Sequence, residues 1–584
     1  MDATQVQKAA EAWRSADPDP ETVRELTALL EARDTASLED RFSASLEFGT
    51  AGLRGVLGAG PNRMNRAVVR RTTAGLARYL KEHVPDVAWR GVVVGRDGRR
   101  LSAELAEDAA RVLAAEGVPA LVFPGVAPTP LTAFAVAHER AAGAVMVTAS
   151  HNPPEYNGYK VYWGNGAQII PPHDQGIARA IDAVEPANLV RLMDVAEAKR
   201  RRLWRELAGN VERDYLDAIL GLRVHRRPGS LRIVYTALHG VGGRLAAEAM
   251  RLAGFDSFHP VPEQQEPDGA FPTVRFPNPE EPGAMDLALG LAAKVGADLV
   301  LANDPDADRL AVAVRGGDGR LVALTGNETG VLLGHYLLTV PKRKAARPLV
   351  VTTIVSSAQL CAIAGELGAQ YDETLTGFKW IANRAMDRAT AQSDDFVFGY
   401  EEALGYTVGT VVRDKDGIGA ALVFADLAAW CQDRGTTVAG YLEEIQRRHG
   451  LFAARQASFA FRGAEGAGVI RSIMDGFRAR PPQRIGGAII ASASDYQAGL
   501  RRAGGKAEHL TLPPSNVIAY QLDGGARVTL RPSGTEPKIK YYFEVREAPR
   551  QAEPMAVARQ RADERLKQLE AAFLVLARER GQPG

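Results

Sequence analysis

The chain of 584 residues has few cysteines, almost no net charge and no long apolar run. Its only cysteines, Cys361 and Cys431, lie far apart and form no Cys-x-x-Cys pair, which argues against a disulfide framework and a thiolate zinc site. Lys and Arg number 71 and Asp and Glu number 70, so no overall field favours a nucleic acid or an anionic membrane. Any anion must therefore be recognised locally.

Export and membrane signals are also missing. The N-terminal segment MDATQVQKAAEAWRSADPDP is polar and acidic, without the basic and then apolar layout of a signal peptide. The longest apolar stretches, such as 349–355 and 419–430, are far shorter than the ~20 residues of a membrane helix. We therefore expect a cytoplasmic protein with no membrane and no nucleic-acid partner.

Short Val/Ala-rich strands alternate with Ala-rich helices through most of the chain, as in the expected strand 92–94 and helix 102–115. This alternation favours α/β units with functional loops at strand ends. The basic run 196–205 fits a solvated helix face better than a nucleic-acid patch. After about Gly450 the pieces become longer and more charged. We predict three similar consecutive α/β domains with mixed sheets and a C-terminal α+β domain, over residues 1–210, 211–325, 326–448 and 449–584.

The first loop that could carry chemistry lies within VTASHNPPEYNGYKVY, residues 147–162. A strand leads into Ser150, and two prolines then hold the turn rigidly. His151 follows directly and Lys160 lies ten residues further on. Ser and Asn are also common turn residues, and no Gly-x-Ser-x-Gly elbow supports a hydrolase.

The second loop is NDPDADR, residues 303–309, between two expected strands. Three carboxylates so close together repel one another unless a cation neutralises them, and oxygen ligands favour Mg²⁺ or Ca²⁺. An EF-hand is excluded because Arg309 stands where its glycine is needed. Solvated turn carboxylates remain the alternative. The candidate metal ligands are Asp304, Asp306 and Asp308.

Two later loops complete the set. FGYEEALGY, residues 398–406, offers Glu401 and Glu402 as acceptors for sugar hydroxyls, although paired glutamates are common. RPSGTEP, residues 531–537, follows a strand and is a plausible phosphate cradle, although it would also pass as a generic turn. Its anion-binding groups are Arg531, Ser533, Gly534 and Thr535.

In this order the four loops resemble those of the α-D-phosphohexomutase family, the phosphoglucomutases and phosphomannomutases. The resemblance extends from about Gly49 (GTAGLRG) to the phosphate loop and includes GRDGRRLS, TALHG and TGFKW. One departure concerns the sugar loop, where YEEALG replaces the family's frequent GEESFG, so that Ala403 stands in place of a serine. This form is similar to the longer branch with phosphopentomutase and bisphosphate-synthase members.

The resemblance implies a phosphate carried on Ser150 and a Mg²⁺ held by the three aspartates and one phosphoserine oxygen. It places the four loops around one central cleft, which we expect to open by movement of the fourth domain. Arg54 and Arg309 are the candidate cations at the transferring group. His151, Lys160 and Lys379 are the candidates for general base and general acid. The distal phosphate would lie on the segment from Arg531 to Lys538, with Glu401 on the ring hydroxyls.

The expected reaction interconverts glucose 1-phosphate and glucose 6-phosphate through a 1,6-bisphosphate, by a monomer or dimer. Phosphomannomutase and phosphopentomutase activity on the same scaffold are the alternatives. A metal-dependent sugar phosphatase and a non-catalytic sugar-phosphate sensor are weaker ones. The intact serine loop argues against the sensor, and the distal phosphate cradle argues against the phosphatase.

Overall fold

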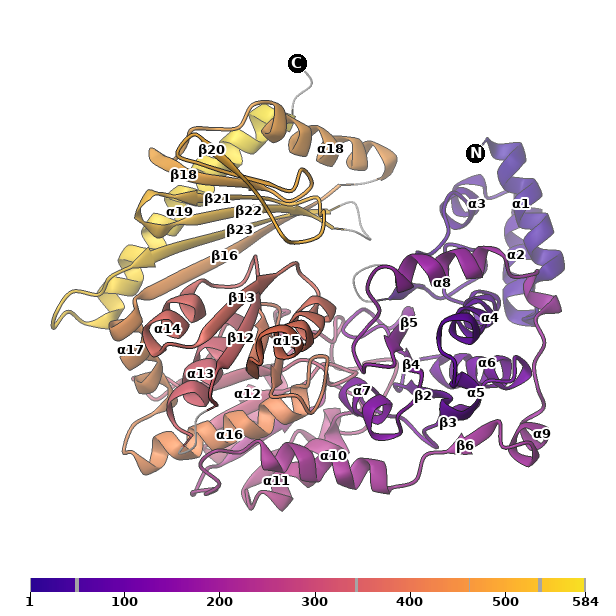
Figure 1. Ribbon diagram of the computed structural model, residues 1–584, viewed down its shortest axis with the longest axis horizontal. Helices are drawn as coiled ribbons and strands as arrows, with labels where there is room; N and C mark the ends of the chain where they lie inside the picture. The colour runs from indigo at the N-terminus through magenta and orange to yellow at the C-terminus, as the bar shows by residue number, and fades with distance from the viewer. Residues whose placement is uncertain (1, 48–51, 342–344, 462, 534–537, 582–584) are drawn as a thin grey trace.

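The computed structural model describes residues 2–47, 52–341, 345–461, 463–533 and 538–581 (Figure 1). The first three residues of GTAGLRG lie outside this part. The described residues form four sheets, and we name the units that contain them the first, second, third and fourth unit. Each sheet lies within one of the four segments expected from the sequence, while the boundaries of those segments stay a prediction.

The first unit has a six-stranded sheet in the order β1-β5-β4-β2-β3-β6, covered by helices and preceded by a bundle of three. Its strands are β1 (Leu53–Val56), β2 (Val92–Arg96), β3 (Ala120–Val122), β4 (Gly143–Val147), β5 (Tyr156–Trp163) and β6 (Trp204–Glu206). Its helices are α1 (Ala3–Ala16), α2 (Pro20–Ala32), α3 (Thr35–Phe42), α4 (Arg66–His83), α5 (Val87–Arg90), α6 (Ser102–Ala115), α7 (Thr129–His138), α8 (His173–Asp182) and α9 (Val195–Arg200).

The second unit has a five-stranded sheet in the order β11-β10-β9-β7-β8. Its strands are β7 (Ile233–Thr236), β8 (Phe258–Pro260), β9 (Leu299–Ala302), β10 (Ala311–Arg315) and β11 (Leu321–Ala323), and its helices are α10 (Asn210–Gly221), α11 (Gly243–Leu252) and α12 (Asp286–Val295). The third unit has the order β13-β12-β14-β15. It consists of β12 (Pro348–Thr353), β13 (Gln370–Thr374), β14 (Asp395–Glu401), β15 (Gly405–Val408), α13 (Gly326–Thr339), α14 (Gln359–Leu367), α15 (Phe378–Gln392), α16 (Gly417–Asp433) and α17 (Val438–His449).

The fourth unit is an antiparallel sheet in the order β16-β23-β22-β21-β18-β19-β20, with β17 beside β18. The amphipathic helix α19 (Met555–Gly581) packs on it through residues such as Leu566 and Phe573. The other elements are β16 (Leu451–Ala460), β17 (Arg484–Ile485), β18 (Ala488–Asp495), β19 (Leu500–Ala503), β20 (Lys506–His509), β21 (Ile518–Leu522), β22 (Arg527–Pro532), β23 (Lys538–Glu547) and α18 (Gly463–Ala479). The expected three α/β domains and one α+β domain are thus confirmed.

The first three sheets share one plan, with parallel central strands and an antiparallel partner after the last of them. This partner is β5 beside β4, β10 beside β9 and β15 beside β14. The three connections between these pairs are the loops that carry the candidate residues. We call them the serine loop (148–155), the metal loop (303–310) and the sugar loop (402–404). Because the connection is equivalent in each sheet, each unit presents its functional loop at the same edge of its own sheet. Contacts between the units then join these loops, as where the Leu310 N–H donates to the Leu404 carbonyl at 3.0 Å.

The basic run 196–205 and the apolar stretch 419–430 follow the expected organisation to different degrees. The basic run 196–205 is only partly a helix face, because α9 ends at Arg200 and Trp204–Glu206 pairs with β3 at the edge of the first sheet. The apolar stretch 419–430 is a core helix as expected, since α16 is buried along nearly its whole length. Among the described residues, no helix has the length and apolar character needed to cross a membrane.

Candidate active site

Ser150 lies immediately after β4 and is held in an uncommon backbone conformation, with φ = 52°. A non-glycine residue in the left-handed region needs support from its surroundings. The Ser150 N–H donates to Thr148 Oγ1 at 2.9 Å, and Arg99 donates to the carbonyl oxygens of Ser150 and Asn152 at 2.5 and 2.6 Å. Arg99 is itself buried and paired with Asp97 at 3.2 Å. The loop is therefore fixed by a guanidinium from the GRDGRR segment.

The Ser150 side chain is turned toward the metal loop. Its Oγ donates to Asp304 Oδ2 at 2.8 Å and lies 3.1 Å from His151 Nδ1. Burial, together with Arg309 and Arg54, holds the pKa of His151 well below its usual value, so the ring is neutral at pH 7. The hydroxyl hydrogen can rotate from Asp304 toward the imidazole, and a neutral imidazole can then accept the proton.

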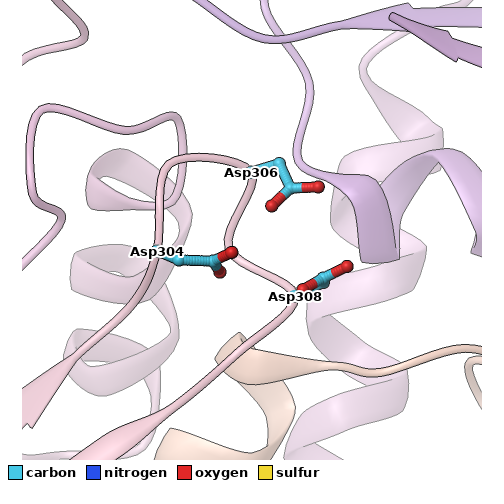
Figure 2. Close-up of side chains that lie close together, drawn as sticks. All are labelled: Asp304, Asp306 and Asp308. Atoms are coloured by element: carbon cyan, nitrogen blue, oxygen red, sulfur yellow. The ribbon is translucent and has the colours of Figure 1, made fainter. Parts of the chain in front are cut away.

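The three aspartates gather inside one turn of the loop between β9 and β10 (Figure 2). One oxygen atom from each lies within 4.8 Å of the others, and all three residues are buried. Asn303 closes the loop by donating to the Arg309 carbonyl at 2.6 Å, and the Arg309 N–H donates to Asp304 Oδ1 at 2.9 Å. The sequence that places a carboxylate at every second position thus folds into a single acidic cluster.

The cluster has the donor set that a divalent cation requires. Asp306 Oδ1 and Asp308 Oδ1 are buried and have no hydrogen-bond partner. Burial and the neighbouring carboxylates raise the pKa of Asp304 well above its usual value, because like charges so close together oppose its ionisation. Buried carboxylate oxygens without partners are costly, and hard oxygen ligands suit Mg²⁺. The residues present therefore fit a metal site.

Two lysines provide positive charge beside the cluster. Lys160 Nζ lies 2.7 Å from Asp306 Oδ2 and 2.8 Å from Asp308 Oδ2, and Lys415 Nζ lies 3.0 Å from Asp308 Oδ2. Burial opposes the charge on Lys160, but the two carboxylates outweigh it and raise its pKa. Lys160 is thus a cation in this arrangement. Such a group acts as an acid or as a fixed charge, not as a base.

A cleft of about 930 Å³ runs beside the serine loop and is lined by residues of all four units. His151, Asn152 and Pro153 line it from the first unit, and Arg309 lines it from the second. The fourth unit contributes two lysines, Lys538 and Lys540. Cations therefore line the cleft beside the serine loop, through Arg309, and on the fourth unit, through the two lysines, together with glutamates such as Glu280 and Glu402. The cations suit a phosphorylated ligand.

The two glutamates at the start of the sugar loop take different places. Glu402 lines the cleft, and its Oε2 accepts from Ser356 Oγ at 3.2 Å. Glu401 is buried, and its Oε1 accepts from the Gly377 N–H at 2.7 Å, which holds the TGFKW segment. β14 ends at Glu401 and Glu402 begins the turn that follows, and of the two only Glu402 lines the cleft.

The remaining candidates are spread more widely. Arg54 Nη1 donates to Asn152 Oδ1 at 2.8 Å; burial lowers its pKa to about 10, at which it stays charged at pH 7. The Lys379 ammonium lies 5.5 Å from the ring centre of Trp380, and burial lowers its pKa against the opposing effect of Asp174. Arg531 lies opposite Lys540 in the β22–β23 pair, and the Ser533 N–H donates to the Lys538 carbonyl at 2.7 Å. Gly534 and Thr535 lie outside the described residues.

Several residues around the site were not anticipated from the sequence. Arg99 and Lys415 lie in GRDGRRLS and RDKDG, so the motifs were visible while the contacts of their side chains were not. Lys540 was within reach of a pattern, because it alternates with Lys538 on one face of a strand. Thr129, which contacts the metal loop from the start of α7, has no local signal in the sequence.

Models of the phosphoglucomutase/phosphomannomutase family match four parts of the chain. Its α/β/α domain I matches residues 45–188, domain II 213–317, domain III 325–448 and the C-terminal domain 490–561. The chain belongs to this family. It is therefore an intramolecular phosphotransferase, an isomerase of sugar phosphates.

The chain is also similar in sequence to individual members of the phosphoglucomutase/phosphomannomutase family over nearly its whole length. The chain is 36% identical to mouse (Mus musculus) phosphopentomutase, over 95% of this chain and 92% of the relative. It is also 36% identical to human glucose 1,6-bisphosphate synthase, over 94% and 91%. The phosphoglucomutase pp63/parafusin of Paramecium shares the fold with a TM-score of 0.66 at 18% identity, covering 91% of this chain and 96% of that one.

Proposed function

We propose that the protein interconverts glucose 1-phosphate and glucose 6-phosphate through a phosphorylated Ser150 and a glucose 1,6-bisphosphate. One observation carries the proposal: the Ser150 hydroxyl contacts a buried carboxylate cluster beside a cleft that Arg309 lines from the second unit and that Lys538 and Lys540 line from the fourth. The cluster of Asp304, Asp306 and Asp308 would hold Mg²⁺. When bound, the ion supplies neutralisation of the charge on the transferring phosphoryl group.

The protein's own groups divide the remaining work. His151, neutral and 3.1 Å from Ser150 Oγ, takes the hydroxyl proton when Ser150 attacks a phosphate of the bisphosphate, and returns it when the phosphate leaves the serine. Arg309 and Arg54 provide positive charge near the serine loop. Lys160 keeps its proton between two aspartates and acts as a fixed cation. Lys379 keeps only the role that the resemblance implies, as a base or acid for the sugar hydroxyl.

The far end of the cleft would hold the phosphate that does not react. Lys538 and Lys540 line it, and Arg531 and Ser533 follow on the same pair of strands. Glu402 faces the cleft and is the better placed glutamate for ring hydroxyls. With one phosphate at each end, the bisphosphate has only to turn around for its second phosphate to reach Ser150. A phosphatase would have no use for this second cationic end.

A second candidate is the interconversion of ribose 1-phosphate and ribose 5-phosphate. It is favoured by the 36% identity to a phosphopentomutase over nearly the whole chain. It is also favoured by Ala403, which replaces a hydroxyl in the sugar loop. Both reactions use the same serine, metal site and distal cations, so they differ only in how the cleft contacts the ring.

The test is a coupled assay of the purified protein with Mg²⁺ and a bisphosphate primer. Glucose, mannose, ribose and glucosamine 1-phosphates are compared by kcat/KM. The proposal expects glucose 1-phosphate to give the highest value, and it requires a strict dependence on both Mg²⁺ and primer. A higher value for ribose 1-phosphate selects the second candidate. Release of inorganic phosphate at the rate of substrate loss would contradict both.

A further inference from the structure

The metal loop is held from outside by a residue of another unit. Thr129 is the first residue of α7, in the first unit, and is completely buried. Its Oγ1 donates to Asp306 Oδ2 at 2.7 Å, and its backbone N–H donates to the Asp306 carbonyl at 2.9 Å. Figure 2 shows a helix in the colour of the first unit beginning beside Asp306. One residue therefore fixes both the side chain and the backbone of a candidate metal ligand.

The two oxygens of Asp306 are in different situations. Oδ2 accepts from Thr129 and from Lys160, both at 2.7 Å, whereas Oδ1 is buried without a partner. The donors on Oδ2 therefore set the rotation of the carboxylate and leave Oδ1 for the cation. Partners that orient a ligating carboxylate in this way affect metal affinity strongly.

The two donors on Oδ2 are not equivalent. Lys160 is a cation that Asp306 shares with Asp308, and a divalent ion in the cluster would repel its ammonium. The hydroxyl of Thr129 is neutral, so its hydrogen bond is compatible with a charged cluster. Thr129 is therefore the donor that can hold Asp306 in the loaded state.

We propose that Thr129 is a positioning residue for the metal site, which orients Asp306 and keeps the metal loop in register with the serine loop. The proposal rests on the metal site of the proposed function. It extends a pattern in which each aspartate is contacted from the first unit: Asp304 by Ser150, Asp306 by Thr129 and Lys160, and Asp308 by Lys160. Because Ser150 and Thr129 belong to one unit, the same scaffold sets the position of the nucleophile and of the metal ligands.

The experiment is a calorimetric titration of the full chain with Mn²⁺, which needs no turnover. Thr129→Val removes the hydroxyl at nearly constant volume, and we expect Mn²⁺ to bind about 10- to 100-fold more weakly. Thr129→Ser keeps the hydroxyl and should bind Mn²⁺ nearly as the wild type does. Thr132→Val is the matched control, since Thr132 lies on the same helix and donates to the Pro128 carbonyl at 3.2 Å. It should bind Mn²⁺ as the wild type does.

Each result decides the matter. Unchanged Mn²⁺ affinity in Thr129→Val, or an equal loss in Thr132→Val, would overturn the role of Thr129 and leave the proposed function standing. If the wild type itself binds no Mn²⁺, the metal site of the proposed function fails, and the role of Thr129 fails with it. Should Thr129→Val not fold, Thr129→Ala provides the same comparison, with circular dichroism verifying the fold.

Discussion

The first three units and the fourth unit differ in how they are joined. A single hydrophobic core passes through the first three, from Val93 of the first to Ile445 of the third. The fourth unit has a core of its own around Val528 and Phe573. It meets the third unit through a small apolar cluster that includes Ile354 and Tyr542. The proposed chemistry thus lies in the first three units, which share a core and form a fused body. The proposed distal phosphate site lies on the fourth unit, which is attached to that body.

This difference matches the demands of the reaction. Phosphoryl transfer needs the serine, the carboxylates and the cations held to within a fraction of an ångström, which a shared core provides. A bisphosphate that turns around needs room, which a separately packed unit can provide by shifting. Arg527 pairs with Glu544 at 3.0 Å and donates to the carbonyl of Ser356, so the contact with the third unit is specific as well as small. We therefore expect substitutions in the fused body to affect kcat and those in the fourth unit to affect KM.

The largest effect is expected from Ser150→Ala. Without the hydroxyl no phosphoenzyme forms, and kcat/KM should fall by about four orders of magnitude or more, as for the loss of a covalent nucleophile. The melting temperature should stay near that of the wild type, because the backbone contacts of Ser150 do not involve its Oγ. Mutase activity above a trace in the purified variant would remove Ser150 from the mechanism.

Asp308→Asn should follow, with a loss of about 100- to 1,000-fold in kcat at saturating Mg²⁺. The substitution removes a metal ligand and the shared partner of Lys160 and Lys415. Asp318→Asn changes an exposed aspartate of the same unit and is the control. An equal effect of the two substitutions on kcat would show that the cluster has no special role.

Lys540→Ala tests whether the fourth unit binds the distal phosphate of the substrate. Hydrogen bonds to charged groups contribute about 1.5–3 kcal/mol, so KM for the sugar phosphate should rise about 10- to 100-fold with a much smaller change in kcat. Lys506→Ala, on the exposed strand β20, should leave both constants unchanged. A fall in kcat with KM unchanged would place Lys540 in the chemical step and break the division between the two bodies.

The last effect concerns stability and lies inside the third unit, where His335 of α13 packs beside His449, the last residue of α17. The rings are 5.3 Å apart, and burial together with His449 lowers the pKa of His335 from 6.5 to about 4. The unfolded chain therefore binds a proton between these values that the folded chain does not, so stability falls as pH decreases from 6.5 to 4. The histidine contributes at most about 3 kcal/mol to this loss.

His335→Gln should flatten that pH dependence. Urea unfolding gives the free energy of unfolding of the variant and of the wild type at pH 5 and at pH 7. The change in this free energy between the two pH values is then compared between the two proteins. His509→Gln, an exposed histidine of β20, should behave as the wild type does. If His335→Gln loses as much stability on acidification as the wild type, His335 is not the acid-sensitive group.

The sequence predicted most of the secondary structure near the site and the loops that carry it, because these depend on local patterns. The strand before Ser150, the strands around the metal loop and the core helix α16 all lie where the apolar runs indicated. The contacts of Arg99, Thr129 and Lys415 were not predictable, because each joins segments far apart in the chain. The different places of Glu401 and Glu402 depend on the exact residue at which β14 ends, which two adjacent glutamates in the sequence do not reveal.

The most direct test of the account is the position of the phosphate on the working enzyme. The wild type is incubated with glucose 1,6-bisphosphate and Mg²⁺, quenched in acid, digested and mapped by mass spectrometry. The account predicts a single phosphate on Ser150. When the bisphosphate carries labelled phosphate, the account predicts that the label on Ser150 is replaced by unlabelled phosphate once excess unlabelled sugar monophosphate is added before the quench. A phosphate on another residue that is transferred to the sugar at the catalytic rate, or full turnover with Ser150 unmodified throughout, would contradict it.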